Sequence, residues 1–365
     1  MGFAVAEDQE LVLPPLEERP LVTFALIAYN QEKYIREAVE GAFAQTYEPL
    51  EIILSDDCST DRTFEIMEEM AKSYSGPHRI RLNRNIINMG ISPHVRFIHE
   101  LSSGQYILHA AGDDISHTER TKKIVLAFLS EKEKPSIVMS NAHYIDDLGN
   151  VVGLKNKLEI KRSFRRNRSA PLNFIGPGGG CTLALSRELV LRFSSPNPKM
   201  IIEDNLLAVR ANLMHGILYI PDILVNYRIN HGSASNPFGT STPVRDDLIA
   251  RHTRWNQERI YGIFQFWEDA KTAQFKQEDH KELYAKIDTY LSCLYDIDSI
   301  LNKTFYLSTI SLLNQLRKLN REAHEIYVPI PYSQPLKLYV LRWFPLFRMI
   351  KNFVLNLSRA KDAAR

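Results

Sequence analysis

The amino-acid sequence predicts an α/β fold: a single, mostly parallel, twisted sheet flanked by helices and followed by a helical C-terminal region. Two observations support this prediction. Short apolar runs rich in β-forming residues alternate with segments of helical hydrophobic spacing through the first third of the chain, which is the pattern of βαβ units. The 365 residues are 44% hydrophobic and 24% charged, so they contain ample material for a sizeable core.

The predicted elements begin with residues 21–28 (LVTFALIA), a buried strand, and residues 32–46, whose apolar side chains recur at helical spacing. A second short strand follows at 52–54, and Thr60 and Asp61 then start a helix. The remaining elements of this half are strands at 79–82 and 106–109 and a helix at 91–100. Ligands bind at the carboxyl ends of the strands in such sheets, and the acidic clusters of this chain follow those ends.

The second half of the sequence is less regular. Residues 155–170 are polar and basic and predict a loop, and Pro221 breaks the strand predicted over 218–227. The sequence further predicts strands at 136–140 and 182–185, helices from Ser186 and over 204–214, and helix nearly throughout from Arg245. We therefore divide the chain into an N-terminal arm (1–20), an α/β domain (21–240) and a helical C-terminal region with a basic amphipathic tail (241–365).

Charge and cysteine content exclude several classes of protein. A net charge of +2 does not suggest a nucleic-acid binder, so no nucleic acid is expected as a partner. Cys58, Cys181 and Cys293 lack CxxC spacing, which argues against a disulfide framework or a structural zinc site and suits a reducing compartment. The N-terminus does not have the features of a secretory signal, and no apolar stretch is long enough to span a bilayer. We therefore expect a cytoplasmic protein.

The first candidate site combines Ala28-Tyr29-Asn30, after one predicted strand, with Asp56-Asp57, after the next. A carboxylate at a strand end can accept a hydrogen bond from a pyrimidine NH or a ribose hydroxyl. The alternative is an acidic turn followed by a helix N-cap, since Asp and Ser favour such places. The chain contains no GxGxxG, so this pattern does not support a dinucleotide site.

The second candidate is Gly112-Asp113-Asp114, which follows the strand at 106–109. Two adjacent carboxylates make a hard oxygen site of the kind that Mg²⁺ or Mn²⁺ prefers, and such a cation can bridge them to a diphosphate. An acidic pair in a turn also occurs without any metal, and that interpretation stays open.

Two further motifs lie in the second half. Glu203-Asp204 opens a predicted helix, where an acidic pair stabilises the N-terminal dipole or, alternatively, supplies a general base for an acceptor hydroxyl. The stretch from Tyr227 to His231 follows a strand, and His231 is either a ligand of the metal or a phosphate, or an ordinary loop histidine.

In this order, the four motifs resemble those of family-2 glycosyltransferases with the A-type nucleotide-sugar fold. The resemblance covers about residues 21–235. It rests on the stretches TFALIAYNQEKYIREAVEGAFAQTYEPLEIILSDDCSTDRT, NMG at 88–90, GQYILHAAGDDI, IIEDNLLAVRA and YRINHGSAS.

The resemblance implies a role for each motif. Tyr29, Asp56 and Asp57 would lie near the base and ribose of the donor, and Asp204 would be the catalytic base. The metal site would hold Mn²⁺ or Mg²⁺ through Asp113 and Asp114, with His231 where a loop closes over the pyrophosphate. The other donor-binding residues that it implies are Ala28, Asn30, Asn88, Gly112 and Arg228.

The implied activity is inverting transfer of a sugar from a nucleotide-sugar donor, with UDP-sugars favoured, to a hydroxyl of a glycan or lipid-linked acceptor in surface polysaccharide synthesis. Two other functions stay open: a non-catalytic sugar-nucleotide-binding or scaffold protein, and a nucleotidyltransferase, which would release pyrophosphate. The sequence departs from the family at one position. The usual stretch is Asp-x-Asp-Asp, and Ala111 stands at its first Asp, so that residue's ribose or metal contact is lost.

The C-terminal tail predicts an amphipathic helix over residues 345–359. One face gathers apolar side chains such as Phe347 and Ile350, and the other carries Arg348 and Lys351. This pattern fits packing on the catalytic domain, and it equally fits a helix lying at an anionic membrane surface. In the second case the protein would be peripheral at the cytoplasmic face of the inner membrane.

Overall fold

The computed structural model of the chain describes residues 12–155, 163–165, 179–193, 203–229, 265, 268–270 and 272–273. All of these belong to one of two compact units, Met1–Asn236 together with Phe264–Lys276. Within this part, no helix combines the length and hydrophobicity that a membrane crossing requires. The predicted tail helix lies outside the described residues, as does most of the predicted C-terminal region.

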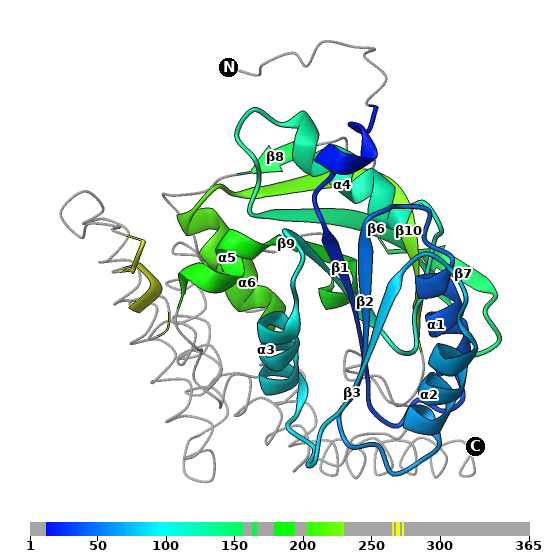
Figure 1. The fold of residues 1–365 in the computed structure, drawn as a ribbon. Helices are drawn as coiled ribbons and strands as arrows, with labels where there is room; N and C mark the ends of the chain where they lie inside the picture. Colours follow the sequence, from blue (N-terminus) through cyan, green and yellow to red (C-terminus); the bar gives the residue numbers. More distant parts are fainter. Residues whose placement is uncertain are drawn as a thin grey trace, which may run out of the picture. The chain divides into compact units, whose positions relative to one another are not determined.

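The first half of the sheet confirms the predicted βαβ pattern (Figure 1). Its four strands are parallel and stand in the order β3-β2-β1-β4. They are β1 (Val22–Ala28), β2 (Leu50–Asp56), β3 (Arg79–Arg84) and β4 (Tyr106–Ala111), connected by α1 (Ile35–Phe43), α2 (Thr63–Ser73) and α3 (Ile91–Leu101). A short 3-10 helix, η1 (Leu16–Glu18), precedes them.

The second half continues the same sheet in the order β9-β6-β10-β5. Since β9 runs antiparallel to both β4 and β6, strands β6 and β10 point the same way as the first four. The elements are β5 (Ile115–Ser116), α4 (Arg120–Ser130), β6 (Ile137–Ile145), β7 (Val151–Leu154), β8 (Ser163–Arg165), η2 (Gly180–Thr182), β9 (Leu183–Ser186), α5 (Arg187–Arg192), α6 (Glu203–Leu213) and β10 (Ile217–Arg228). The α/β class is therefore confirmed, with a mixed sheet of ten described strands.

Two predictions for this half were wrong. Strand β8 lies within the predicted loop 155–170 and pairs with β10, because tertiary pairing overrides the polar composition. Strand β10 runs through Pro221 without a break. Its register with β6 shifts between Tyr219 and Ile223, and such an irregularity tolerates a proline that cannot donate to the ladder. The short strands β5 and β7 and helix α4 had no predicted counterpart.

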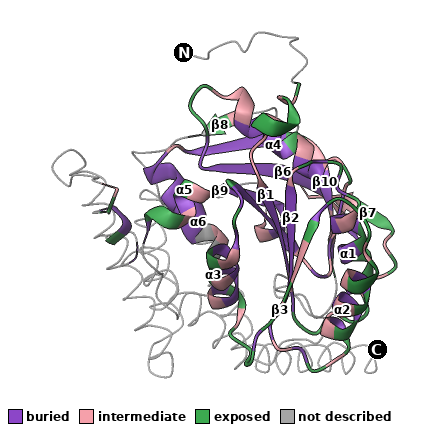
Figure 2. Cartoon of the chain, in the orientation of Figure 1, coloured by how far each residue is buried: buried purple, intermediate pink, exposed green. Residues whose placement is uncertain are grey.

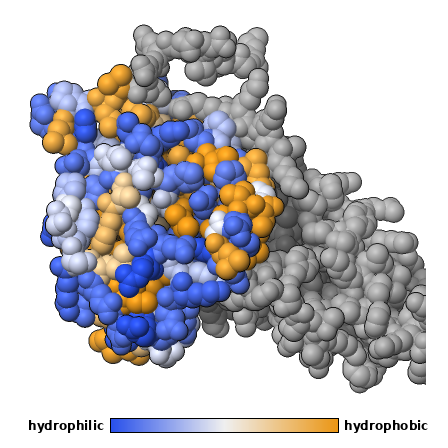
Figure 3. All heavy atoms as spheres, turned by 90° about the vertical axis from the view of Figure 1, so that its right-hand side faces the viewer, coloured by the Kyte–Doolittle hydropathy of each residue, from blue (hydrophilic) through white to orange (hydrophobic). Residues whose placement is uncertain are grey.

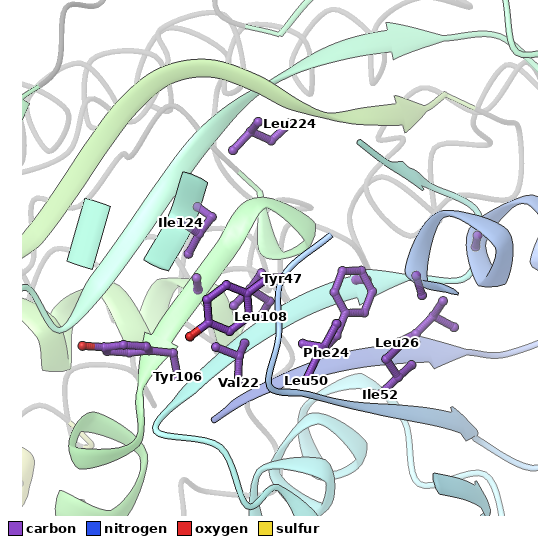
Figure 4. Packing of buried hydrophobic residues seen from close by; sticks show 14 of the residues in the cluster. Val22, Phe24, Leu26, Tyr47, Leu50, Ile52, Tyr106, Leu108, Ile124 and Leu224 are labelled. Carbon is purple, nitrogen blue, oxygen red and sulfur yellow. The ribbon is translucent and has the colours of Figure 1, made fainter. Parts of the chain in front are cut away.

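The two faces of the sheet bury different side chains, as the alternation along β1 shows. Phe24 and Leu26 join a large core with α1, α2 and α4, whereas Ala25 faces α3 and α5 on the other side. Figure 2 shows the central strands of the sheet as largely buried, and Figure 4 shows the larger core from close by. On the side of α1 and α2 the surface is largely hydrophilic, with apolar patches between (Figure 3). This double-sided burial fixes the strand ends that carry the candidate site.

Candidate functional site

The first two predicted motifs, which comprise three segments of the chain, meet at the carboxyl edge of the sheet. Ala28 stands opposite Asp56 in the β1–β2 register, and Ile27 stands opposite Ala111 in the β1–β4 register. The ladder continues past the strands, since the Asp57 N–H donates to the Ala28 carbonyl at 2.9 Å. The Gly112 N–H likewise donates to the Ile27 carbonyl at 2.9 Å. Parallel strands therefore bring residues 28–30, 56–57 and 112–114 to one place.

The loop after β2 is tied to the loop after β1. Asn30 donates its backbone N–H to the Ser59 hydroxyl at 2.8 Å, and its Oδ1 accepts from the Thr60 N–H at 2.9 Å. Asp56, which is fully buried, accepts from the Ser59 N–H at 2.9 Å and also from the Ser59 hydroxyl. Asn30 has a φ of 51°, in the left-handed region that Asn tolerates better than most residues. These contacts hold both loops in one conformation, while the neighbouring Tyr29 ring is exposed.

Asp57 organises the loop that follows β3. Its carboxylate accepts from the Asn85 amide at 2.7 Å and from the backbone N–H groups of Met89 and Gly90, both at 2.9 Å. Asn88, which is exposed, also accepts from the Gly90 N–H at 2.9 Å. Sequence reasoning did not single out Asn85, because Asn83 and Asn88 lie close to it in the sequence and nothing local distinguishes the three. The predicted contact of Asp57 with the base stays a prediction.

Gly112 lies where the chain passes closest to the β1 loop. A Cβ at this position would come 2.4 Å from Gln31 Oε1, 2.8 Å from the Ala28 Cβ and 3.0 Å from Ile35 Cδ1. Real Cβ atoms do not approach other atoms so closely, so a side chain here requires its neighbours to move. Glycine therefore lets the turn of residues 112–114 after β4, called here the acidic turn, pack against β1 and α1.

The adjacent carboxylates Asp113 and Asp114 have different surroundings. Asp114 is buried, with its Oδ1 accepting from the Arg228 N–H at 2.9 Å, and its Oδ2 has no hydrogen-bond partner among the described residues. Burial, and next the charge of Asp113, raise the pKa of the Asp114 carboxyl to about 7. Asp113 itself is half-buried.

This pair fits a divalent cation. A cation would relieve the repulsion between the Asp113 and Asp114 carboxylates. The Asp114 Oδ2, which has no hydrogen-bond partner among the described residues, could coordinate it. The described residues contain no group of three or more His, Cys, Asp or Glu side chains arranged around a metal. Two carboxylates suffice for Mg²⁺, which is commonly held by one or two carboxylates, with substrate phosphates and water completing its shell.

Arg228 clamps the acidic turn to the rest of the edge. Its Nε donates to the Asp113 carbonyl at 3.0 Å, and its two terminal nitrogens donate to the Asp146 carbonyl at 2.8 Å and the Glu37 carboxylate at 2.6 Å. The guanidinium also lies 4.6 Å from the centre of the Tyr34 ring. Every guanidinium nitrogen thus has a protein partner, and Arg228 acts here as a positioning residue for Asp113 and Asp114.

Arg120 is a second buried cation near this turn, and sequence reasoning missed it. One terminal nitrogen donates to the carbonyls of His109 and Cys181, both at 2.6 Å, and the other donates to the Ser116 hydroxyl at 2.9 Å. Opposite charge also attracts it to Asp114. An arginine in the first turn of a helix is usually solvated, so the sequence around Arg120 carried no signal of this role.

Two predicted site residues remain, Asp204 and His231. Asp204 lies in the first turn of α6 at a half-buried position. His231 lies outside the described residues, so its predicted place in the metal site is carried forward only as a proposal.

A comparison with known protein families identifies the family to which this part of the chain belongs. The family model described as glycosyl transferase family 2 matches residues 23–190. These residues form a family-2 glycosyltransferase domain. The matched segment contains strands β1 to β9 and all the residues of the edge described above except Arg228.

Individual relatives align with the same part of the chain. EpsE of Bacillus subtilis is 33% identical over 130 residues, which is 36% of this chain and 46% of EpsE. Chondroitin synthase of Escherichia coli is 31% identical over 137 residues, covering 38% of this chain and 19% of the synthase. The chain thus spans less than half the length of these curated relatives.

Solved structures show the same fold at low sequence identity. TarS 1–349 of S. aureus, solved in complex with UDP-GlcNAc, has a TM-score of 0.53 and 16% identity, with 88% of this chain and 87% of that chain covered. The mannosyltransferase PcManGT from Pyrobaculum calidifontis, in complex with GDP-Man and Mn²⁺, has a TM-score of 0.51 and 16% identity, with 94% and 91% covered. The chain therefore has the A-type glycosyltransferase fold.

Proposed function

We propose that this protein transfers a sugar from a nucleotide-sugar donor to a hydroxyl of an acceptor, with inversion at the anomeric carbon. The observation that carries the proposal is the meeting of Ala28, Asp56 and the Gly112–Asp114 turn at one carboxyl edge within a family-2 domain. Solved proteins of the same fold are complexes with UDP-GlcNAc and GDP-Man, which supports a nucleoside-diphosphate donor.

The donor would lie along this edge. Tyr29, Asp56 and Asp57 would contact the base and ribose, together with Ala28, Asn30, Asn88 and Gly112 in the loops beside them. Asp113 and Asp114 would hold Mn²⁺ or Mg²⁺, with His231 as a further ligand. The cation would neutralise charge that builds up on the departing diphosphate. Arg228 would keep the carboxylates in place.

Asp204 would remove the proton from the acceptor hydroxyl. A carboxylate that acts on the face of the sugar opposite the diphosphate permits direct displacement and therefore inversion. A covalent sugar–enzyme intermediate is unnecessary in this scheme. The acceptor would be a glycan or a lipid-linked sugar in surface polysaccharide synthesis, in keeping with the similarity to chondroitin synthase.

The site of action would be the cytoplasmic face of a membrane. The predicted tail helix of residues 345–359 would hold the protein there through its basic and apolar faces. Co-sedimentation with anionic vesicles tests this part of the proposal: doubling the salt concentration should weaken binding, and a protein that never sediments would contradict it.

The activity itself is tested by turnover. Purified protein is incubated with Mn²⁺, a panel of UDP- and GDP-sugars and glycan acceptors that carry free hydroxyls. Release of nucleoside diphosphate is measured together with the anomeric configuration of the glycoside formed. Release of nucleoside diphosphate with an inverted product supports the proposal. In a parallel reaction with a nucleoside triphosphate and a sugar 1-phosphate, release of pyrophosphate would indicate a nucleotidyltransferase. A product with retained configuration would contradict the role of Asp204.

A further inference from the structure

Lys155 follows strand β7 and is held close to the candidate donor site. Its backbone N–H donates to the Ala142 carbonyl at 2.9 Å, which fixes the start of the side chain on β6. Its ammonium lies 4.1 Å from the centre of the Tyr227 ring. Tyr227 is the residue before Arg228, whose own N–H contacts Asp114, so the lysine lies next to the acidic turn.

The ammonium of Lys155 also lies against the backbone of Gly179. A Cβ at Gly179 would come 2.6 Å from the lysine Nζ. The charge of Lys155 also acts on Asp114 and Cys181, so the ammonium is within electrostatic range of the acidic turn. The ammonium thus lies close to an aromatic ring and a glycine backbone, and its charge reaches the acidic turn.

Lys155 differs from the two other cations around Asp114 in its partners. Arg120 and Arg228 donate to carbonyl, hydroxyl and carboxylate groups of the protein with every terminal nitrogen. The ammonium of Lys155 has the Tyr227 ring but no hydrogen-bond acceptor among the described residues. A half-buried ammonium with donors to spare is suited to an anionic ligand.

We propose that Lys155 binds the diphosphate of the nucleotide donor, as a protein cation that adds to the charge supplied at Asp113 and Asp114. This inference rests on the proposed function, which places a diphosphate at the same turn. Ala111 contributes no carboxylate there, so the edge carries less negative charge against an incoming diphosphate than a site with a third acidic group. Lys155 is accordingly a binding residue for phosphate oxygens, and its charge should act with or without a metal ion.

The test measures binding by calorimetry with UDP and GDP, using whichever nucleotide binds the wild type more tightly. Lys155→Met is compared with Lys134→Met, which removes an exposed lysine between α4 and β6. Each protein is titrated in EDTA and in Mn²⁺, and also with the corresponding nucleoside. Lys155→Met should weaken diphosphate binding about tenfold or more in EDTA, since a hydrogen bond to a charged group is worth that much. The affinity of Lys155→Met for the nucleoside should equal that of wild type, as should both affinities of Lys134→Met. Lys155→Arg should retain most of the affinity for the diphosphate.

The outcomes separate this inference from the proposed function. If the wild type binds neither UDP nor GDP, the nucleotide-donor function falls and the inference falls with it. If the wild type binds and Lys155→Met binds the diphosphate equally well in EDTA, only the inference is overturned, and Lys155 is a local counter-charge for Asp114. An equal loss of nucleoside and diphosphate affinity would also overturn it, because it would show an indirect disturbance of the site. Thermal melting of each variant confirms that the fold is intact.

Discussion

The two halves of the sheet build the candidate site in different ways. In the first half, strands β1 to β4 are parallel and joined through helices, and the site residues follow the strand ends directly. In the second half, antiparallel strands are interleaved, and β10 changes register twice along its length. The second half supplies buried side chains, above all Arg228, that cross the edge and fasten the acidic turn. The first half thus places backbone loops, and the second half fixes their charged side chains.

Because the two halves contribute differently, mutations in them should affect nucleotide binding, stability and catalysis in different ways. Changes at the buried loop residues of the first half, such as Asp57 and Gly112, should alter nucleotide binding and stability together, because these residues are also packed structure. In the second half, a change at Asp204 should remove catalysis and leave nucleotide binding intact, whereas a change at Lys155 should weaken binding of the diphosphate without unfolding the protein.

The largest expected effect is on catalysis. Asp204→Asn in α6 should lower the turnover number by about 10²- to 10⁴-fold, since an amide cannot accept the acceptor proton. Donor affinity, measured by calorimetry, should stay within about twofold of wild type. Asp222→Asn, which alters the exposed ion pair with Lys123, serves as the control. Transfer by the Asp204 variant within tenfold of wild type would show that the base lies elsewhere.

A large effect on stability is expected at Asp57. Asp57→Ala removes the acceptor of three hydrogen bonds at a buried position and should lower the free energy of unfolding by about 2–3 kcal/mol. Asp147→Ala is the matched change in the second half. Its carboxylate is 42% exposed, pairs with Lys33 at 3.7 Å and accepts one hydrogen bond from the Tyr34 hydroxyl at 2.9 Å, so its loss should cost only about 1 kcal/mol. Urea denaturation of both variants measures the difference, and equal costs would contradict the structural role of Asp57.

The convergence of Ala28, Asp56 and Gly112 could be predicted from the sequence. Each residue follows a short apolar run, and parallel strands put their carboxyl ends at one edge. The contact between Arg228 and Glu37 could not be predicted, because it joins residues 191 positions apart and leaves no local pattern. The same holds for Arg120, whose role comes from the carbonyls of two other elements.

Continuity of β10 through Pro221 also escaped prediction. A proline inside an apolar run argues against a central strand unless a register shift accommodates it, and such a shift depends on the partner strand. The second half was therefore less predictable because its geometry is set by long-range pairing.

Acid pH should destabilise the junction of the two halves. His99 on α3 and His109 on β4 are buried with their Nε2 atoms 2.7 Å apart, and burial lowers the pKa of both, that of His109 to about 4. The nearby charges of Arg210 and Arg120 act in the same direction. The unfolded chain, with a histidine pKa of about 6.5, therefore binds more protons than the folded chain between pH 6.5 and 4.

Stability contributed by this pair is complete above pH 6.5 and is lost as the pH falls towards 4. The loss from His109 alone should reach about 2 kcal/mol at pH 5. Denaturation midpoints measured from pH 8 to 5 should fall less steeply for His109→Asn than for wild type. Parallel pH profiles for wild type and His109→Asn would rule out this account.

The smallest effect compares two glycines. Gly112→Ala forces a Cβ to within 2.8 Å of the Ala28 Cβ and should cost about 1–3 kcal/mol, with weaker nucleotide binding. A Cβ at Gly153 in β7 has the Tyr144 ring as its nearest neighbour, at 3.8 Å, so Gly153→Ala should be neutral or slightly stabilising. Melting temperatures of the two variants provide the check, and a neutral Gly112→Ala would mean that the acidic turn docks less tightly than its contacts indicate.

The most direct test of the central claim is calorimetry of Asp113→Asn with UDP and GDP, with and without Mn²⁺. The account places a metal-bridged diphosphate at this turn, so wild type should bind nucleotide more tightly when Mn²⁺ is present. In Asp113→Asn this gain should be lost or greatly reduced, while the melting temperature stays near that of wild type because the Asp113 carbonyl still accepts from Arg228. A variant that binds nucleotide and Mn²⁺ as well as wild type does would contradict the assignment of the donor site to this edge.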